Sequence, residues 1–365
     1  MSLIAGFERQ YKENYRTRGR YSPIGLDFGS GRIKILQLKQ RSGQISPHQL
    51  AHFPSIPGAM TDLDNHREKM MVNNLKKVLN SNNWQGKGAC LTLDSKACYL
   101  RLIKLPVMNN RELKQAVHWE AGNCFPFGPG EAIISYMNLD HKVAGRPGDF
   151  NRYLVAAVLK ETANRYTDLT LKAGLNSLSL ETPSTALLRS LAGRYDSEND
   201  HPKNYHLYID LGYSSTLLLL CKNGGYCFHR SLPQGIKSIY KSIAVKTGSD
   251  HKTALQLVFN KNLAYGKSIA TEMEYLIRGI NESLAYWSDI NQTAPITPST
   301  LTVGGGGSFI AGLALFLQKS FAIKPVLDSP FQGLSNGSSK KELMAREQAA
   351  LFSVAHGLAL RGWLK

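Results

Sequence analysis

Cysteine is scarce in this sequence: there are five in 365 residues, and no two have the CxxC spacing of metal or redox sites. Several lie in apolar, strand-like stretches, which favours buried reduced thiols over a disulfide framework or a metal centre. The five are Cys90, Cys98, Cys124, Cys221 and Cys227. This pattern indicates a reducing compartment.

Long hydrophobic runs are also missing. No apolar stretch approaches the roughly 20 residues that a membrane-spanning helix requires. The N-terminal segment has only a short apolar patch, so we expect no signal peptide and interpret residues 1–20 as a flexible lead-in. These absences together predict a cytoplasmic protein.

Acidic residues are few: 27 Asp and Glu against 44 Lys and Arg give a formal net charge of +17. Such an excess favours anionic partners. The one local basic cluster, Arg9–Arg20, is either a contact with an anionic membrane leaflet or a solvated tail. We predict no nucleic-acid partner, because no recognition helix, zinc site or aromatic–basic pattern is present.

An internal repeat organises the chain. Ile24–Leu38 (IGLDFGSGRIKILQL) has a near-copy at Tyr208–Cys221 (YIDLGYSSTLLLLC). Each copy is an apolar strand ending in Asp-x-Gly, a polar turn and a second apolar strand, and a Gly-bearing turn and a third strand follow. Two matching β-meanders predict two homologous lobes. A length of 365 residues also favours at least two lobes.

The pattern between and after the repeats predicts four parts. They are the lead-in 1–20, a lobe I core at 21–94 with 158–204 and 342–365, an inserted strand–helix–strand–strand unit at 95–157, and lobe II at 205–341. The polar stretch 195–204 is the predicted linker. Helices are expected at 68–80, 111–122, 160–174, 184–193, 236–246, 267–287, 309–320 and 342–360, while 248–262 is ambiguous.

The two Asp-x-Gly turns suit phosphate binding, because a glycine lets backbone N–H groups approach an anion. The predicted phosphate-binding residues are Gly29, Ser30, Gly31, Lys34, Gly212, Tyr213, Ser214 and Ser215. Asp27 and Asp210 are predicted to hold Mg²⁺ through water, since carboxylates repel phosphate directly. Two such turns facing each other would form a nucleotide cleft. Taken singly, each Asp-x-Gly turn has an ordinary structural explanation, and Lys34 is as readily a solvated side chain.

A run of glycines before a predicted helix is the third element. Free N–H groups at a helix N-terminus accept a flat or anionic ligand, so a purine and ribose are expected on this run. Its residues are Gly304, Gly305, Gly306, Gly307 and Ser308. The alternative is a tight connector.

Together these elements are similar to the two phosphate loops and the adenosine loop of the actin/Hsp70/hexokinase superfamily. More narrowly, the chain resembles the PilM/MshI family of type IV pilus assembly proteins. The resemblance covers about residues 22–362 and rests on LDFGSGRIKILQL, RLIKLP, HWEAGNCFPF, IDLGYSSTLLLL, RSLPQGI, LTVGGGGSFIAGLALFLQKSFAIKPVLDSPF and VAHGLALRG.

The resemblance implies an α/β, actin/Hsp70-like ATPase fold whose inserted unit, as in FtsA, replaces an actin subdomain. It implies ATP and Mg²⁺ as cofactors. It also implies a scaffold in a pilus assembly complex, peripheral to the inner membrane, that binds the N-terminal peptide of a PilN-like inner-membrane protein. Self-association stays open. The partner-binding residues it suggests are Leu102, Leu105, Pro106, Leu113 and Val117.

The chain departs from the family pattern at Ser30-Gly31-Arg32, where serines are usual. Glu181 stands where related enzymes position water, and whether it does so stays open. Turnover is expected to be slow at most. The alternative function is a sugar-kinase-class phosphotransferase, which needs an Asp base between the lobes, and Asp94 is the early candidate.

Overall fold

The computed structural model describes residues 20–41, 43–57, 60, 65–81, 83–128, 130–140, 148–192, 194, 205–259, 266–331 and 348–361. The predicted linker 195–204, nearly all of the lead-in and most of the loop at 329–341 lie outside the described residues.

The chain forms two compact units. The first comprises residues 1–28, 35–186 and 358–365, and the second comprises 29–34 and 187–357. The predicted lobe I included 187–204 and 342–357, and the described residues of these ranges, 187–192, 194 and 348–357, belong to the second unit. Side chains and carbonyls near residues 190 and 350 bond to other groups of that unit, which accounts for the difference.

The first unit is built on a sheet with strand order β3-β2-β1-β4-β8. Its strands are β1 (Ile24–Phe28), β2 (Arg32–Arg41), β3 (Gln44–Pro54), β4 (Gly88–Thr92) and β8 (Asn176–Glu181). β4 is parallel to both β1 and β8. The helices α2 (Asn65–Asn80) and α4 (Lys160–Lys172) also belong to this unit.

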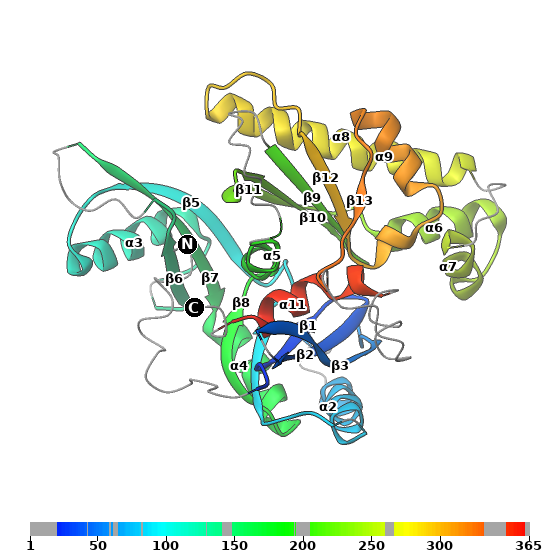
Figure 1. Ribbon diagram of the computed structural model, residues 1–365, viewed down its shortest axis with the longest axis horizontal. Helices are drawn as coiled ribbons and strands as arrows, with labels where there is room; N and C mark the ends of the chain where they lie inside the picture. The colour runs from blue at the N-terminus through cyan, green and yellow to red at the C-terminus, as the bar shows by residue number, and fades with distance from the viewer. Residues whose placement is uncertain are drawn as a thin grey trace. The chain divides into compact units, whose positions relative to one another are not determined.

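The second unit repeats that strand order as β11-β10-β9-β12-β13 (Figure 1). Its strands are β9 (Tyr205–Leu211), β10 (Thr216–Lys222), β11 (Gly225–Leu232), β12 (Thr300–Gly304) and β13 (Val326–Leu327). The meander β9-β10-β11 is antiparallel, and β12 is parallel to β9 and β13. The equal order of the two sheets agrees with the internal repeat in the sequence.

Four helices cover one face of the second sheet. They are α6 (Ile236–Thr247), α7 (His251–Phe259), α8 (Gly266–Ile290) and α9 (Leu313–Phe321). All four share one hydrophobic core with β9, β10 and β12. The stripe predicted on the long helix faces this core: Met273, Leu276, Ile280 and Leu284 are buried. α7 lies in the stretch that the sequence left ambiguous.

The strand–helix–strand–strand order predicted for the inserted unit is confirmed, and the segment lies within the first unit. It consists of β5 (Tyr99–Pro106), α3 (Asn110–Cys124), β6 (Ala132–Asn138) and β7 (Phe150–Leu159), with the antiparallel order β5-β7-β6. The Asn109 side chain caps α3 by accepting from the backbone N–H groups of Arg111 and Glu112. The helix ends just before Pro126, which cannot continue it.

Two helix predictions were wrong in detail. The helix expected from Phe309 begins at Leu313, because a 3₁₀ turn, Gly306–Phe309, and a left-handed Gly312 come first. The closing helix expected over 342–360 is, within the described residues, a 3₁₀ turn (Ala349–Leu351) followed by α11 (Ser353–Ala359). A tertiary contact contributes to this break, since the Ala350 carbonyl accepts the Gly305 N–H.

Candidate functional site

Asp27, at the end of β1, is a buried acid held by a neighbouring strand. The Thr92 hydroxyl of β4 donates to Asp27 Oδ1 at 3.0 Å, and Thr92 Oγ1 accepts the Phe28 N–H at 3.3 Å. This contact fixes the carboxylate at the carboxyl end of the first sheet. Sequence reasoning did not identify Thr92, although it ends the strand parallel to β1.

Residues 29–34, which are the turn after β1 and the start of β2, belong to the second unit. The Lys34 side chain folds back over this turn, and a Cβ at Gly29 would lie 2.7 Å from Lys34 Nζ. The same Cβ would lie 2.8 Å from the Arg32 carbonyl oxygen. The glycine therefore leaves room for the ammonium group, which lies against the turn, and Lys34 is half-buried.

The turn between β9 and β10 is closed by its own backbone. The Gly212 N–H donates to the Ser215 carbonyl at 3.0 Å, and a Cβ at Gly212 would lie 2.8 Å from that oxygen. The first turn of α6 also binds here: Ile236 N–H donates to Gly212 O at 3.0 Å, and Lys237 N–H donates to Tyr213 O at 2.8 Å. These N–H groups of α6 are thus satisfied by protein.

The two turns contact each other within the second unit. The Ser214 hydroxyl donates to Ser30 Oγ at 2.7 Å, and a Cβ at Gly31 would lie 2.5 Å from the Cβ of Tyr213. Tyr213 stacks on Tyr240 with their hydroxyls 2.8 Å apart, and burial raises the pKa of Tyr213 to about 12. Two hydroxyls and the Lys34 ammonium therefore lie on adjoining turns, a donor set that suits an anion.

The glycine run follows β12 and packs directly on β9. A Cβ at Gly304 would lie 2.1 Å from the Tyr208 hydroxyl, and one at Gly305 would lie 2.3 Å from Asp210 Oδ1. A Cβ at Gly307 would lie 2.2 Å from Leu211 Cγ. Three of the four glycines are therefore required by packing against the protein itself. Asp210 therefore lies beside this run, which is the predicted adenosine loop.

The expected helix N-terminus is not formed at this run, because α9 starts at Leu313. The Ser308 hydroxyl donates to the Gly305 carbonyl at 2.6 Å and so serves the 3₁₀ turn. Gly306 is the least crowded residue of the run, with Ile236 Cδ1 3.4 Å from a Cβ built there. The run is a tight connector that borders Asp210.

Two candidate acids have structural partners. Glu181 is buried and forms an ion pair with Arg361 at 2.7 Å, and its other oxygen lies 3.5 Å from the Thr185 hydroxyl. Asp94 accepts the Lys96 N–H at 3.0 Å, as in a side-chain-capped turn. Both acids thus have structural contacts, and the water-positioning role of Glu181 stays a prediction.

The predicted partner-binding residues divide into two groups. Leu105, Leu113 and Val117 are buried between α3 and its sheet, so the structure assigns them to the core of the inserted unit. Leu102 and Pro106 are exposed on β5. The family resemblance suggested these residues as partner contacts but did not show that α3 and the sheet of the same unit bury three of them.

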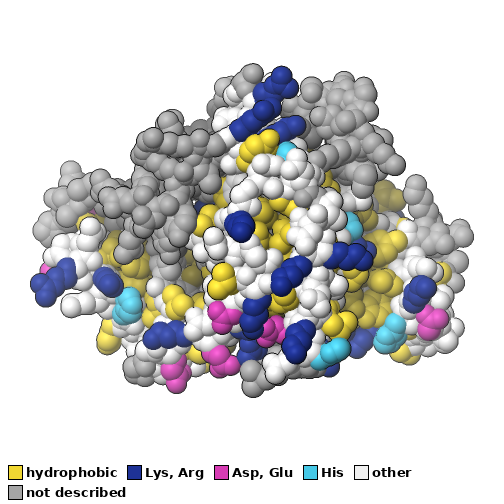
Figure 2. Space-filling view, turned by 90° about the horizontal axis from the view of Figure 1, so that it is seen from below, with side chains coloured by type: hydrophobic (Ala, Val, Ile, Leu, Met, Phe, Trp, Pro, Cys, Tyr) yellow, Lys and Arg dark blue, Asp and Glu magenta, His cyan; other side chains and the backbone are white. Residues whose placement is uncertain are grey.

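Among the described residues, no cluster of three or more His, Cys, Asp or Glu side chains could hold a metal ion. The five cysteines are free; Cys90 and Cys221 are buried as expected, whereas Cys98 and Cys227 are half-buried and Cys124 is exposed. Lys and Arg side chains are scattered over the face drawn in Figure 2 and do not gather in one patch.

Residues 25–363 match the model of a protein family described as type IV pilus assembly protein PilM. A solved chain from a PilM–PilN type IV pilus biogenesis complex is 25% identical to this one, with a TM-score of 0.83, and the match covers 95% of this chain and 100% of that chain. The ethanolamine utilization protein EutJ from Carboxydothermus hydrogenoformans is 11% identical over 95% of this chain and 92% of its own, with a TM-score of 0.52. With the two sheets of equal order, these similarities show the actin-like ATPase fold.

Proposed function

Because the chain belongs to the family of type IV pilus assembly proteins PilM, we propose that it is a nucleotide-binding scaffold of pilus biogenesis. In this proposal it binds the N-terminal tail of a PilN-like inner-membrane protein. The supporting observation is its similarity, over 95% of its length, to a chain solved in a PilM–PilN complex. Mannose-sensitive pili of the MshI type are the alternative system. A sugar kinase is not favoured, since the Asp94 carboxylate caps a turn.

The inserted unit offers a surface for an extended apolar peptide. One face of its sheet is covered by α3, while exposed apolar side chains lie at Leu102 (38% exposed), Ile133 (46%) and Phe150 (51%). Cross-strand pairing places Leu102 opposite Leu154 and Pro106 opposite Phe150. Because alternate residues of a strand share a face, Leu102 and Phe150 lie on the side opposite α3. We propose that this face takes the partner's tail.

Calorimetric titration with a synthetic peptide of the partner's N-terminal tail tests this proposal. Leu102→Ser and Phe150→Ser should each weaken binding about tenfold, since a buried apolar side chain contributes roughly 1.5–3 kcal/mol. Leu171→Ser is the matched control, because Leu171 is 63% exposed near the end of α4 and is not part of the inserted sheet. Absence of binding in every nucleotide state would refute the partner assignment.

For the nucleotide, we propose ATP with Mg²⁺. Phosphate oxygens would accept hydrogen bonds from the hydroxyls of Ser30, Ser214 and Ser215 and from the ammonium of Lys34. This set of donors contains no carboxylate that would repel an anion. Asp210 would hold Mg²⁺ through water, a mode in which the ion needs only one or two carboxylates besides phosphate. Asp27 has the corresponding role at the end of β1. The glycine run would lie beside the adenosine.

Titration with ATP, with and without Mg²⁺, tests the nucleotide site. Lys34→Ala should weaken ATP binding at least about tenfold, because a charge-assisted hydrogen bond contributes roughly 1.5–3 kcal/mol. Lys76→Ala, an exposed lysine on α2, should leave the affinity unchanged. Equal affinities of the two variants would count against phosphate binding by this turn. We expect hydrolysis to be slow at most.

We also propose that the protein lies at the inner face of the inner membrane through its partner. No helix of the described residues is sufficiently long and apolar to cross a bilayer. The +17 formal charge would add attraction to an anionic leaflet. Sedimentation with vesicles that carry the partner, at rising salt concentration, separates the two contributions.

A further inference from the structure

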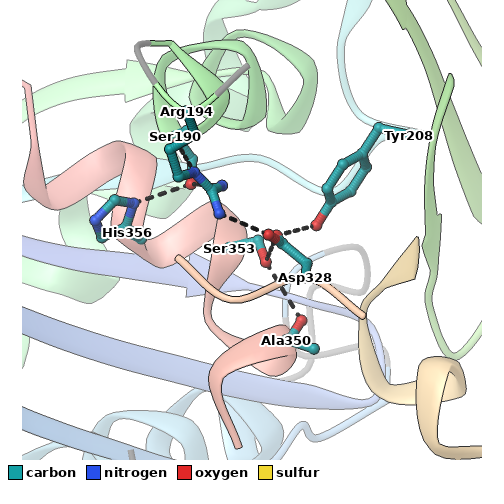
Figure 3. A network of polar contacts seen from close by, with 7 residues as sticks. All are labelled: Ser190, Arg194, Tyr208, Asp328, Ala350, Ser353 and His356. Carbon is teal, nitrogen blue, oxygen red and sulfur yellow. Dashed lines mark hydrogen bonds and ion pairs between the residues drawn. The ribbon is translucent and has the colours of Figure 1, made fainter. Parts of the chain in front are cut away.

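A buried polar network centred on Asp328 lies in the second unit (Figure 3). Asp328 follows β13, and its side chain has no exposed surface. Its Oδ1 accepts from Arg194 Nη1 at 2.7 Å, while Oδ2 accepts from the hydroxyls of Tyr208 and Ser353. The carboxylate therefore joins three segments that are far apart in the sequence.

Two further contacts extend the network along its helical side. Arg194 Nε donates to the Ser190 carbonyl at 2.6 Å, and Ser190 Oγ lies 2.9 Å from His356 Nδ1 (Figure 3). Ser190 lies in α5 (Pro183–Leu191), and His356 lies in α11. Both helices are thus tied to Asp328, directly or through Arg194 and Ser190.

The other side of the network reaches the glycine run. The Tyr208 hydroxyl, held by Asp328, occupies the position next to Gly304 that a Cβ would need. The Ala350 carbonyl accepts the Gly305 N–H at 2.8 Å and also lies 3.4 Å from Ser353 Oγ. Asp328 therefore holds the Tyr208 hydroxyl beside Gly304 directly. It reaches the Ala350 carbonyl, which bonds Gly305, only by positioning Ser353, whose single hydroxyl proton is donated to Asp328.

The helices α5 and α11 have a special place in the chain. The boundaries between the two units fall within them, after Ala186 and after Gly357. A buried ion pair adds little net stability compared with apolar packing, but its geometry can select one arrangement of its surroundings. A network that joins the glycine run to α5 and α11 can therefore link a change at the run to both helices.

We propose that Asp328 is a positioning residue: it fixes Gly304 and Gly305 and couples occupancy of the glycine run to α5 and α11. This inference rests on the nucleotide-binding part of the proposed function. In this role the network transfers a local change at the glycine run to α5 and α11, the segments through which the chain passes between its units.

Amide hydrogen exchange of the full chain tests the coupling without nucleotide. Ser353→Ala and Tyr208→Phe each remove one hydroxyl that donates to Asp328. Both variants keep the ion pair between Asp328 and Arg194, whereas Asp328→Asn would break it. We expect exchange of the Gly305 region and of residues 350–357 to rise about three- to tenfold, the effect of losing one hydrogen bond. The controls are Ser288→Ala and Tyr226→Phe, two buried hydroxyls of the same unit that are bonded elsewhere.

The same proteins are then titrated with ATP and Mg²⁺. We expect ATP to slow exchange in 350–357 of the unchanged protein, and the two test variants to bind ATP about three- to tenfold more weakly and to lose this protection. Exchange and affinity equal to those of the controls would overturn the inference. If the unchanged protein binds no nucleotide, the proposed nucleotide site fails on its own. In that case the link from Asp328 to the glycine run is still tested without nucleotide, and it is overturned if the test variants exchange at the same rate as the controls.

Discussion

Replacing Gly305 by alanine should destabilise the second unit strongly. Gly305 has φ +77° and ψ 175°, a backbone region nearly restricted to glycine, where another residue costs about 1–3 kcal/mol. Its new Cβ would lie 2.3 Å from Asp210 Oδ1 and 2.6 Å from the Leu211 carbonyl oxygen. The carboxylate can rotate, but the carbonyl belongs to the central strand β9, so overpacking adds about 1–3 kcal/mol. The expected loss is therefore about 2–6 kcal/mol.

The neighbouring glycine provides the control. A Cβ at Gly306 would have Ile236 Cδ1 at 3.4 Å and Leu351 Cδ2 at 3.8 Å, both at or near ordinary contact distance. Gly306→Ala should therefore change the free energy of unfolding by less than about 1 kcal/mol. Urea unfolding followed by circular dichroism compares the two variants directly. If Gly305→Ala unfolds at the same urea concentration as Gly306→Ala, the packing argument for the glycine run is refuted.

Three further outcomes are expected. Glu181→Gln should lower the free energy of unfolding by about 3–5 kcal/mol, because it removes the negative charge from a largely buried ion pair with Arg361; reduced ATP turnover at unchanged stability would instead indicate a water-positioning role. Burial lowers the pKa of His356 to about 3, so the unfolded chain binds the proton more readily and stability falls as pH drops below about 6.5. His356→Gln should make the urea midpoint of unfolding depend less on pH between about pH 6 and pH 4. An unchanged pH dependence of the midpoint would contradict this. Ser214→Ala should weaken ATP binding about three- to tenfold in a titration, whereas the exposed control Ser320→Ala should not.

The fold was predictable where local patterns repeat. The apolar strands around Asp27 and Asp210 predicted two matching meanders, and the two sheets have the same strand order. The continuous stripe from Met273 to Leu284 predicted a core-facing helix, because only one face of α8 meets the sheet. Each of these signals depends on periodicity within a short window.

The misplaced elements depend on tertiary contacts that no short window contains. The sequence from 342 to 360 is helical in pattern, yet the Ala350 carbonyl accepts an N–H from Gly305 instead of continuing a helix. Similarly, Asp328 stands in a short polar turn, and nothing near it indicates a partner at Arg194, 134 positions earlier. The network in Figure 3 has no sequence signature for this reason.

The glycine run shows how a motif can be located correctly for a reason other than the expected one. Sequence reasoning explained the glycines by the space a ligand needs, whereas Gly304, Gly305 and Gly307 are each required by contact with β9. The glycines thus follow from the fold whether or not a nucleotide binds. The groups that can test the proposed nucleotide site are instead the polar ones on the two turns, above all the Lys34 ammonium and the Ser30 and Ser214 hydroxyls. For this reason the lysine and serine variants, rather than the glycine variants, discriminate between a nucleotide-binding scaffold and one that keeps only the fold.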